Sequence, residues 1–570
     1  MITLGLNHSN DSAAALVVDG QPVAAVLEER LDRVKHSTAF PQQAMNFCLT
    51  RGKVTLADLD QVAFFWNPGI HLTAFKASQA SVWRHHSEYL TTLPYWLVSR
   101  WPQRPQDRRV TRMTQEIYLD GAKRPLHIEY VNHHLTHVAA AFFCSPYETA
   151  AVLTIDGYGE RVSCLGAHGK GLKTDVLFEV EFPHTLGSVY SAVTQWLGFL
   201  PNCDEGKTMG LAPYGATDYL EDFRRIFRLT EDGLYRVDGE MFTLGLERPR
   251  RFSPAFEKRF GPARATNDPI EDRHRAVAAS LQTAVEEVMI HMTRHLLKRT
   301  GERRLCMAGG VALNCVANGK LAEALDLEHL YVQPAAGDGG SSLGAALWVQ
   351  HALNGVPRGA PMLHDFLGPS YTNEEIVQFL DIGGLPYYTP DHLNAHIARR
   401  LANGEIVGWF SEGAEYGPRS LGNRSILADP RNPGMKDHLN KRVKHREAFR
   451  PFAPSALAER AHDIFDFKGD SPFMLRAHPV KPAWRERLPA ITHVDGSARI
   501  QTVNKTVHGR YHALISAFEK ETGVPVIVNT SFNIKGEPIV TTPADAVKCY
   551  LTTGIDTLVM GDIVMSKKQA

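Results

Sequence analysis

Two histidines and two distant aspartates have the residue types and spacing of one metal site. His133 and His137 are four residues apart, so a helix over residues 132–143 would place both imidazoles on one face. Asp156 ends a strand-like run and Asp338 lies in a glycine-rich turn, and both can supply oxygen ligands. This donor set suits Fe(II), Zn or Mn, and the lack of a thiolate disfavours a closed structural zinc. With 26 histidines in the chain, a chance pair at this spacing is the alternative.

Two glycine-rich turns follow strand-like segments in the same half of the chain. Gly309 and Gly310 precede Asn314, and the segment 335–344 contains Asp338. Glycine lets the backbone approach a ligand closely and turn successive N–H groups toward an anion. Together the turns favour a nucleotide site, with the metal ligand Asp338 beside the phosphates.

A third glycine-containing segment, residues 204–215, is predicted to be a loop that carries one lysine. Lys207 would suit a phosphate contact, although the same composition is also typical of a surface turn. Lys35 is another candidate cation, and its charged surroundings equally suit a solvated face.

The C-terminal part has its own cationic constellation. Arginines and lysines gather in a glycine-punctuated loop at 416–424 and in the segments 441–446 and 449–454. Arginine forks bind phosphate in bidentate fashion and lysine acts as a point charge, so the cluster could hold ATP or RNA. The balanced charge of the chain favours a small polyanion. Residues 499–502 and 529–533, each expected at a strand edge, add polar side chains that could orient a small planar group.

No rival catalytic motif stands out. The sequence has neither a nucleophile elbow nor a Walker lysine loop. A zinc protease of the HExxH type needs glutamate after the first histidine, and here that residue is His134.

A strand–turn–strand pattern occurs twice in the first half. Residues 2–7 and 13–18 form one predicted hairpin, and residues 150–157 and 161–169 form the second. Two related lobes of the actin-like ATPase fold would each open with such a hairpin, its polar turn facing the nucleotide phosphates. Two unrelated hairpins are the alternative.

The remaining elements alternate between strand and helix, which predicts an α/β fold for both halves. A linker of turn formers at 354–362 separates a domain over 1–353 from one over 363–570. The aromatic, basic stretch 81–115 could be a substrate-contacting insertion or a lid, and the alternative is that its aromatic residues only pack in the core. The other predicted strands are 62–66, 126–131, 304–308, 405–410, 524–528 and 557–560, and the predicted helices are 271–299 and 545–551.

Composition limits the class of protein. A chain of 570 residues exceeds one usual core and predicts at least two domains. Lysine plus arginine and aspartate plus glutamate number 62 each, so no overall field favours nucleic acid or an anionic membrane. The seven scattered cysteines indicate a reducing cytoplasm, and no apolar run approaches the length of a membrane span.

Ordered motifs along nearly the whole chain resemble the O-carbamoyltransferases of the NodU, CmcH and TobZ type. The resemblance implies an N-terminal TsaD-like domain of the actin-like ATPase fold and a C-terminal YrdC-like α/β domain. It implies that carbamoyl phosphate and ATP give a carbamoyl-adenylate, which carbamoylates a hydroxyl of a small natural product such as an antibiotic. The matching segments are 10–14, 28–36, 132–137, 206–215, 309–314, 417–424, 449–454 and 529–533.

The resemblance also assigns residues to the two halves. In the YrdC-like half, the residues expected to hold phosphates, carbamoyl phosphate and the nucleotide with its Mg²⁺ are Arg419, Lys444, Arg450, Arg499, Thr502, Asn529, Ser531 and Asn533. In the TsaD-like half, the metal would be Fe(II) on His133, His137, Asp156 and Asp338, and the residues expected near the adenylate are Lys35, Lys207, Gly310, Asn314 and Gly339.

One departure from the family pattern concerns the first turn. Members commonly have His-Asp where this chain has Asn10-Asp11, and a histidine is displaced to His8. We expect His8 to take the role of the family histidine in transfer.

Two other functions are compatible with the sequence. One is threonylcarbamoyl transfer to tRNA, against which the neutral charge and the absence of a basic tail count. The other is a regulatory actin-like ATPase that works without carbamoyl phosphate. The resemblance leaves the acceptor open among aminoglycosides, macrolides, ansamycins, nucleosides and cephems, and it does not indicate an oligomeric state.

Overall fold

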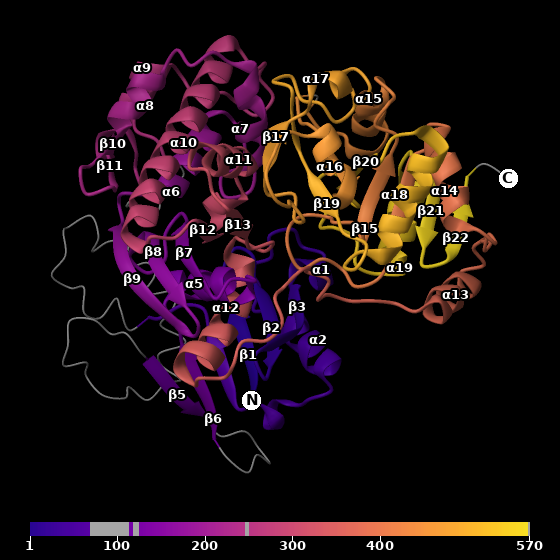
Figure 1. The fold of residues 1–570 in the computed structure, drawn as a ribbon, viewed down its shortest axis with the longest axis horizontal. Coiled ribbons are helices and arrows are strands. Elements are labelled where there is room, and N and C mark those ends of the chain that lie inside the picture. The colour runs from indigo at the N-terminus through magenta and orange to yellow at the C-terminus, as the bar shows by residue number, and fades with distance from the viewer. Residues whose placement is uncertain (69–112, 118–124, 245–249, 448, 568–570) are drawn as a thin grey trace. The chain divides into compact units, whose positions relative to one another are not determined.

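The chain forms two compact units in a computed structural model that describes residues 1–68, 113–117, 125–244, 250–447 and 449–567 (Figure 1). Most of the aromatic stretch 81–115 therefore lies outside the described residues. The first unit comprises Met1–Ala25, Thr38–Ala317 and Leu321–Met362, and the second comprises Val26–Ser37, Asn318–Lys320 and Leu363–Ala570.

The first unit opens with a six-stranded sheet in the order β3-β2-β1-β4-β6-β5. β1 pairs antiparallel with β2 and parallel with β4, which pairs parallel with β6. The strands are β1 (Ile2–Asn7), β2 (Ala13–Val18), β3 (Gln21–Leu27), β4 (Gln61–Phe64), β5 (Met113–Ile117) and β6 (Leu126–Tyr130).

A second sheet in this unit has the order β13-β12-β7-β8-β9. From β9 to β13 its strands correspond to β3, β2, β1, β4 and β6 of the first sheet. β7 pairs antiparallel with β8 and parallel with β12, which pairs parallel with β13. Each sheet thus has an antiparallel meander followed by two parallel strands, which confirms the prediction of two related lobes of the actin-like ATPase fold. The strands are β7 (Thr149–Ile155), β8 (Val162–Lys170), β9 (Lys173–Glu181), β12 (Arg304–Ala308) and β13 (His329–Val332).

Two helices connect the sheets. α5 (His133–Cys144) packs on β7, β8 and β12 of the second sheet, whereas α12 (Ser341–Leu347) packs on β1, β2 and β4 of the first. α5 and α12 also pack against each other. Glycines allow this approach: a Cβ on Gly344 would lie 1.9 Å from the carbonyl oxygen of Thr136, and one on Gly5 would lie 1.9 Å from that of Ser342.

The other helices of this unit include a long buried one, α10 (Asp272–Thr300), close to its predicted bounds. The prediction of a loop at 204–215 is wrong, because Glu205–Leu211 is helix α7, which packs against α6 and α10. Tertiary packing overrides the low helix propensity of its two glycines. The remaining elements are α2 (Gln42–Gly52), α6 (Leu186–Trp196), α8 (Leu220–Ile226), α9 (Pro254–Phe260), α11 (Cys315–Ala324), β10 (Phe227–Leu229) and β11 (Tyr235–Val237).

The second unit is built on a mixed seven-stranded sheet in the order β19-β16-β20-β15-β14-β21-β22, with a separate β17–β18 ribbon. Its core is continuous through the large side chains Trp409, Phe410 and Phe518. Its strands are β14 (Val407–Phe410), β15 (Arg424–Ala428), β16 (Ala453–Leu457), β17 (Ala477–Pro479), β18 (Ser497–Arg499), β19 (Gln501–Val503), β20 (Val526–Ser531), β21 (Thr557–Met560) and β22 (Ile563–Ser566).

The second unit also contains helices, and one of them comes from far upstream in the sequence. The short helix α1 (Glu29–Asp32) belongs to the second unit. The others are α13 (Asn373–Ile382), α14 (Leu393–Ala402), α15 (Met435–Leu439), α16 (Ala458–Ile464), α17 (Pro482–Arg485), α18 (Gly509–Thr522) and α19 (Pro543–Thr552). Among the described residues, no helix is long and apolar enough to cross a membrane.

Gly344→Ala tests the close packing of α12 on α5. The added methyl group would collide with the Thr136 carbonyl oxygen, so we expect the free energy of unfolding to fall by about 1–3 kcal/mol. Denaturant unfolding measures this loss. Gly206→Ala in α7 is the matched control, since its Cβ would meet nothing within 4 Å. Equal unfolding free energies for the two variants would contradict the packing account.

Candidate functional site

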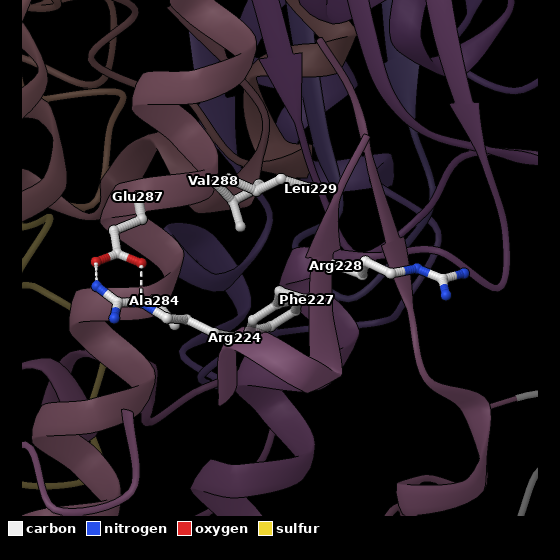
Figure 2. A pocket seen from close by; sticks show the side chains of 7 residues that line it. All are labelled: Arg224, Phe227, Arg228, Leu229, Ala284, Glu287 and Val288. Atoms are coloured by element: carbon white, nitrogen blue, oxygen red, sulfur yellow. Dashed lines mark hydrogen bonds and ion pairs between the residues drawn. The ribbon is translucent and has the colours of Figure 1, made fainter. Parts of the chain in front are cut away.

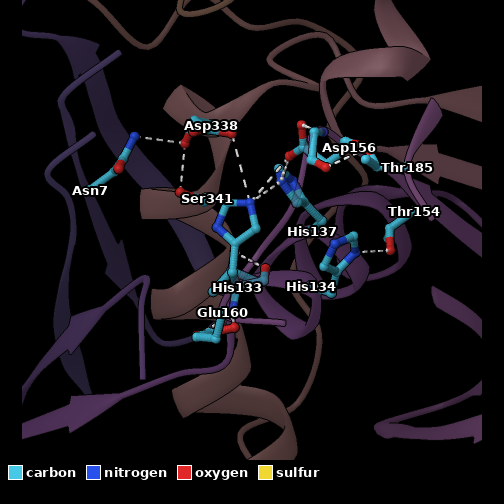
Figure 3. Close-up of polar contacts among 12 residues, drawn as sticks. Asn7, His133, His134, His137, Thr154, Asp156, Glu160, Thr185, Asp338 and Ser341 are labelled. Atoms are coloured by element: carbon cyan, nitrogen blue, oxygen red, sulfur yellow. Dashed lines mark hydrogen bonds and ion pairs between the residues drawn. The ribbon is translucent and has the colours of Figure 1, made fainter. Parts of the chain in front are cut away.

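The four predicted metal ligands converge in the first unit (Figure 3). His133 and His137 lie in the first turns of α5, Asp156 directly follows β7, and Asp338 begins the turn before α12. The four residues therefore meet where the two packed helices begin, beside the end of β7. One ligand atom from each of the four lies within 4.8 Å of the others.

The distances among these atoms suit ligands of a single ion. The Nε2 atoms of His133 and His137 are 3.0 Å apart, and they lie 3.2 and 2.9 Å from Oδ2 of Asp156. Oδ1 of Asp338 is 3.7 Å from Nε2 of His133. Two donors bound at about 2.1 Å and at right angles to each other would be about 3 Å apart. The donor set and its spacing therefore fit a divalent metal.

Charges are crowded at this cluster. Burial would lower the pKa of His133, but its hydrogen bond to Asp156 and the charge of Asp338 raise it to about 9. Burial, followed by the Asp156 charge, raises the pKa of Asp338 to about 7. Burial and the charge of His133 lower the pKa of His137. A bound cation would displace the protons from these imidazole and carboxyl groups, because metal ligands must be deprotonated.

Supporting hydrogen bonds come from residues that the sequence did not single out. Asn7, at the end of β1, donates from Nδ2 to the carbonyl oxygens of Asp11 and Asp338, both at 2.8 Å. Glu160 Oε1 accepts the backbone N–H groups of His133 at 3.0 Å and Asn67 at 2.7 Å. Asn7 could have been found from the sequence, because it is a polar residue at the end of a predicted buried strand.

The first turn, between β1 and β2, carries His8, Asn10 and Asp11. His8 Nε2 lies 3.1 Å from the Thr38 carbonyl oxygen, and burial lowers the pKa of the ring. The Asp11 charge contributes to the raised pKa of Asp338, so this turn lies near the metal ligands. Asn10 is exposed.

Of the residues expected near the adenylate, two lie beside the metal cluster. A Cβ on Gly310 would be 3.1 Å from Oδ1 of Asp156, and Gly339 is buried in the Asp338 turn. Asn314 caps α11 by accepting the Ala317 N–H at 3.1 Å.

Lys207 lies on helix α7 rather than on an open loop. Its Nζ forms an ion pair with Asp204 at 2.9 Å. A phosphate contact from Lys207 would therefore compete with this ion pair.

In the second unit, Lys444 ends the π-helix Asn440–Lys444, and its side chain reaches the end of strand β20. Its Nζ donates to the carbonyl oxygen of Ser531, to Oγ of Ser531 at 3.2 Å, and to the carbonyl oxygen and Oδ1 of Asn533 at 3.0 and 2.9 Å. Three residues that the resemblance assigns to the nucleotide and carbamoyl phosphate are thus brought together.

Other cations surround Lys444. Burial, then the charges of Arg446, Arg450 and Lys35, lower the pKa of Lys444 well below its usual range. Burial, then Arg450 and Arg499, lower the pKa of Arg446 to about 9. We call Lys35, Lys444, Arg446, Arg450 and Arg499 the cationic cluster. The repulsion among these cations would be relieved by a bound anion. Arg446 belongs to the basic segment 441–446 of the sequence, but the resemblance assigned it no role.

Two other expected residues of this unit are engaged within the protein. Asn529 is buried in β20, and its Nδ2 donates to the carbonyl oxygen of Ser420 at 3.1 Å. Thr502, on the edge strand β19, accepts the Ser471 N–H at 3.0 Å through Oγ1. Arg419 is half-buried on the loop that contains Ser420.

A surface pocket of about 250 Å³ lies elsewhere in the first unit, between α8, β10 and α10 (Figure 2). The pair Arg224–Glu287, with hydrogen bonds of 2.9 and 2.6 Å, lines it beside Phe227 and Val288. It contains none of the predicted site residues.

The sequence matches the family Carbamoyltransferase N-terminus over residues 3–347 and the family Carbamoyltransferase C-terminus over residues 398–567. The chain therefore belongs to the carbamoyltransferase family, as its motifs predicted, and it is a transferase of carbamoyl groups.

Relatives are similar along most of their length. Nodulation protein NolNO of Sinorhizobium fredii is 37% identical over 571 residues, which cover 98% of this chain and 79% of that protein. Nodulation protein U of Rhizobium tropici is 30% identical, with 93% and 91% covered. An uncharacterised protein of Synechocystis is 39% identical, with 99% and 96% covered.

Joint replacement of the two helix histidines tests the metal cluster. We expect the His133→Ala/His137→Ala double variant to lose bound metal, because two of four donors are removed. Elemental analysis of the purified protein measures this. His134→Gln is the matched control, since His134 lies on the same helix but its Nδ1 is 2.7 Å from Oγ1 of Thr154. Equal metal content in the double variant and the unmodified enzyme would contradict the assignment.

Proposed function

We propose that the protein is an ATP-dependent O-carbamoyltransferase that works through carbamoyl-adenylate and acts on a hydroxylated small molecule. The observation that carries this proposal is the presence of two different sites, a cationic cluster in the second unit and a His₂Asp₂ cluster in the first. Membership of the carbamoyltransferase family supports carbamoyl transfer.

The second unit, which we propose to be YrdC-like, would make the adenylate. Carbamoyl phosphate and water give carbamate and phosphate. A carbamate oxygen then attacks the α-phosphorus of ATP, supplied with Mg²⁺, and displaces pyrophosphate. Lys444, Arg446, Arg450 and Arg499 would hold the anionic reactants and oppose the charge that develops on the leaving group. Asn533 and Ser531 would fix the Lys444 ammonium through their oxygen atoms.

The first unit would transfer the carbamoyl group. The acceptor hydroxyl oxygen attacks the carbamoyl carbon, the bond to AMP breaks, and the hydroxyl proton is lost. His133, His137, Asp156 and Asp338 would hold Fe(II) or another divalent metal, which acts as a Lewis acid toward the carbamoyl or phosphate oxygens when bound. Gly310, beside Asp156, would leave room for the adenylate.

Product analysis tests this function directly. ATP and carbamoyl phosphate should give AMP, pyrophosphate and phosphate, and a panel of hydroxylated natural products should reveal the carbamoylated acceptor by mass spectrometry. The metal-free His133→Ala/His137→Ala variant should retain adenylate formation and lose transfer. ATP turnover that does not depend on carbamoyl phosphate would contradict the proposal.

The pH dependence of carbamoyl phosphate binding tests the cationic cluster. The pKa values of Lys444 and Arg446 are lowered, so these groups lose their protons at a lower pH than usual, and their attraction for the anion is lost with them. Affinity measured by calorimetry should therefore fall as the pH rises through about 9. Lys444→Met should bind more weakly and show a shallower pH dependence. Affinity that is constant or rises with pH would count against the cluster.

His8→Ala tests the departure from the family pattern. If His8 serves the transfer step, the variant should carbamoylate the acceptor more slowly and still form adenylate at the normal rate. Burial lowers the pKa of His8, so its ring is neutral near pH 7 and can accept a proton. Transfer and adenylate assays on the same preparation separate the two steps, and unchanged transfer would overturn this role.

A further inference from the structure

Arg419 lies on a loop, residues 411–423, that joins β14 to β15 and lacks regular secondary structure. Backbone N–H and C=O groups in such a buried loop need partners other than a helix or sheet ladder. Buried side chains supply them on both sides of Arg419, and all of these side chains belong to the second unit.

Glu415 fixes the backbone that follows Arg419. A single carboxylate oxygen, Oε1, accepts the N–H groups of Leu421 at 2.7 Å, Asn423 at 2.9 Å and Arg424 at 3.3 Å. The Glu415 side chain is only 2% exposed. The loop thus turns back on itself around this carboxylate.

Arg30 and Asp365 fix the backbone that precedes Arg419. Asp365 Oδ2 accepts the Gly417 N–H at 3.0 Å, and Arg30 Nη2 donates to the Gly417 carbonyl oxygen at 2.9 Å. Arg30 is 2% exposed, although it comes from α1, 387 residues before Gly417 in the sequence. The N–H and the carbonyl group of Gly417 are therefore held by two buried side chains, the carboxyl of Asp365 and the guanidinium of Arg30.

Side chains from two strands of the sheet bind backbone carbonyl groups directly after Arg419. Asn529 of β20 donates to the Ser420 carbonyl oxygen at 3.1 Å, and Gln501 of β19 donates through Nε2 to that of Leu421 at 2.7 Å. The backbone on either side of Arg419 therefore has little freedom, and the direction in which its side chain leaves the loop is set.

We propose that Arg30 and Glu415 are positioning residues that hold this loop so that Arg419 presents its guanidinium to carbamoyl phosphate. This inference rests on the proposed function, in which Arg419 binds that anion. It makes the upstream segment Val26–Ser37 a working part of the C-terminal site. Charge balance supports the arrangement, since burial disfavours the charged form of Arg30 while Glu29, Glu415 and Asp365 favour it.

Arg33 provides a matched control within the same segment. It donates to the carbonyl oxygens of Ile539 at 2.7 Å and Pro538 at 3.0 Å and lies 3.3 Å from Asp545. Arg33→Met would therefore remove contacts that do not involve the Arg419 loop, whereas Arg30→Met would remove the Gly417 contact.

The experiment compares steady-state carbamoyl phosphate kinetics of the full-length, metal-loaded enzyme and its variants. Arg30→Met should raise KM for carbamoyl phosphate by about 10- to 100-fold with a smaller change in kcat, because the loop is misplaced. Arg30→Lys should recover part of this loss, and it also serves if Arg30→Met fails to fold. Glu415→Gln should raise the same KM, and Arg33→Met should leave it unchanged.

A double-mutant cycle with Arg419→Ala separates positioning from general destabilisation. If Arg30 acts through Arg419, adding Arg30→Met to Arg419→Ala should raise KM no further. Fully additive effects, or an equal effect of Arg33→Met, would overturn the inference and leave the proposed function standing. No effect of Arg419→Ala itself on KM for carbamoyl phosphate would overturn the inference together with the role of Arg419 in the proposed function.

Discussion

The packing of α12 against α5 is the contact on which the cluster of His133, His137, Asp156 and Asp338 depends. α5 rests on one sheet of the first unit and α12 on the other, and the two helices approach closely because residue 344 has no side chain. His133 and His137 lie at the start of α5, and Asp338 lies just before α12. A separation of the two helices would pull Asp338 away from the histidines.

Like charges are crowded at both sites, negative carboxylates at the first and positive side chains at the second. Two carboxylates and two imidazoles crowd the first site, and burial with the Asp156 charge raises the pKa of Asp338. Cations crowd the second, where the pKa values of Lys444 and Arg446 are lowered by burial and by neighbouring positive charge. The first site suits a cation and the second suits phosphates, which is the division that the proposed two-step transfer requires.

The sequence predicted most of what depends on local pattern. Alternation and apolar runs located β1, β2, β12 and β21, and helical periodicity located α10, because these signals come from neighbouring residues. The His133–His137 spacing and the strand-end Asp156 led to the His₂Asp₂ cluster for the same reason.

Features that depend on distant contacts were not predicted. The loop at 204–215 is helical through packing on α6 and α10. Asn7 bridges Asp11 and Asp338, and Arg30 reaches Gly417, only once the chain has folded. Nothing in the residues around Arg30 distinguishes it from an ordinary surface charge, and its burial follows from partners in the second unit.

A single-turnover rapid-quench measurement tests the central claim most directly and needs no knowledge of the acceptor. The intact enzyme is mixed with ATP and isotopically labelled carbamoyl phosphate, quenched at short times and analysed by mass spectrometry. The account predicts a labelled carbamoyl-AMP species that accumulates together with pyrophosphate before AMP appears. Label that remains in carbamoyl phosphate while ATP is left intact would contradict it.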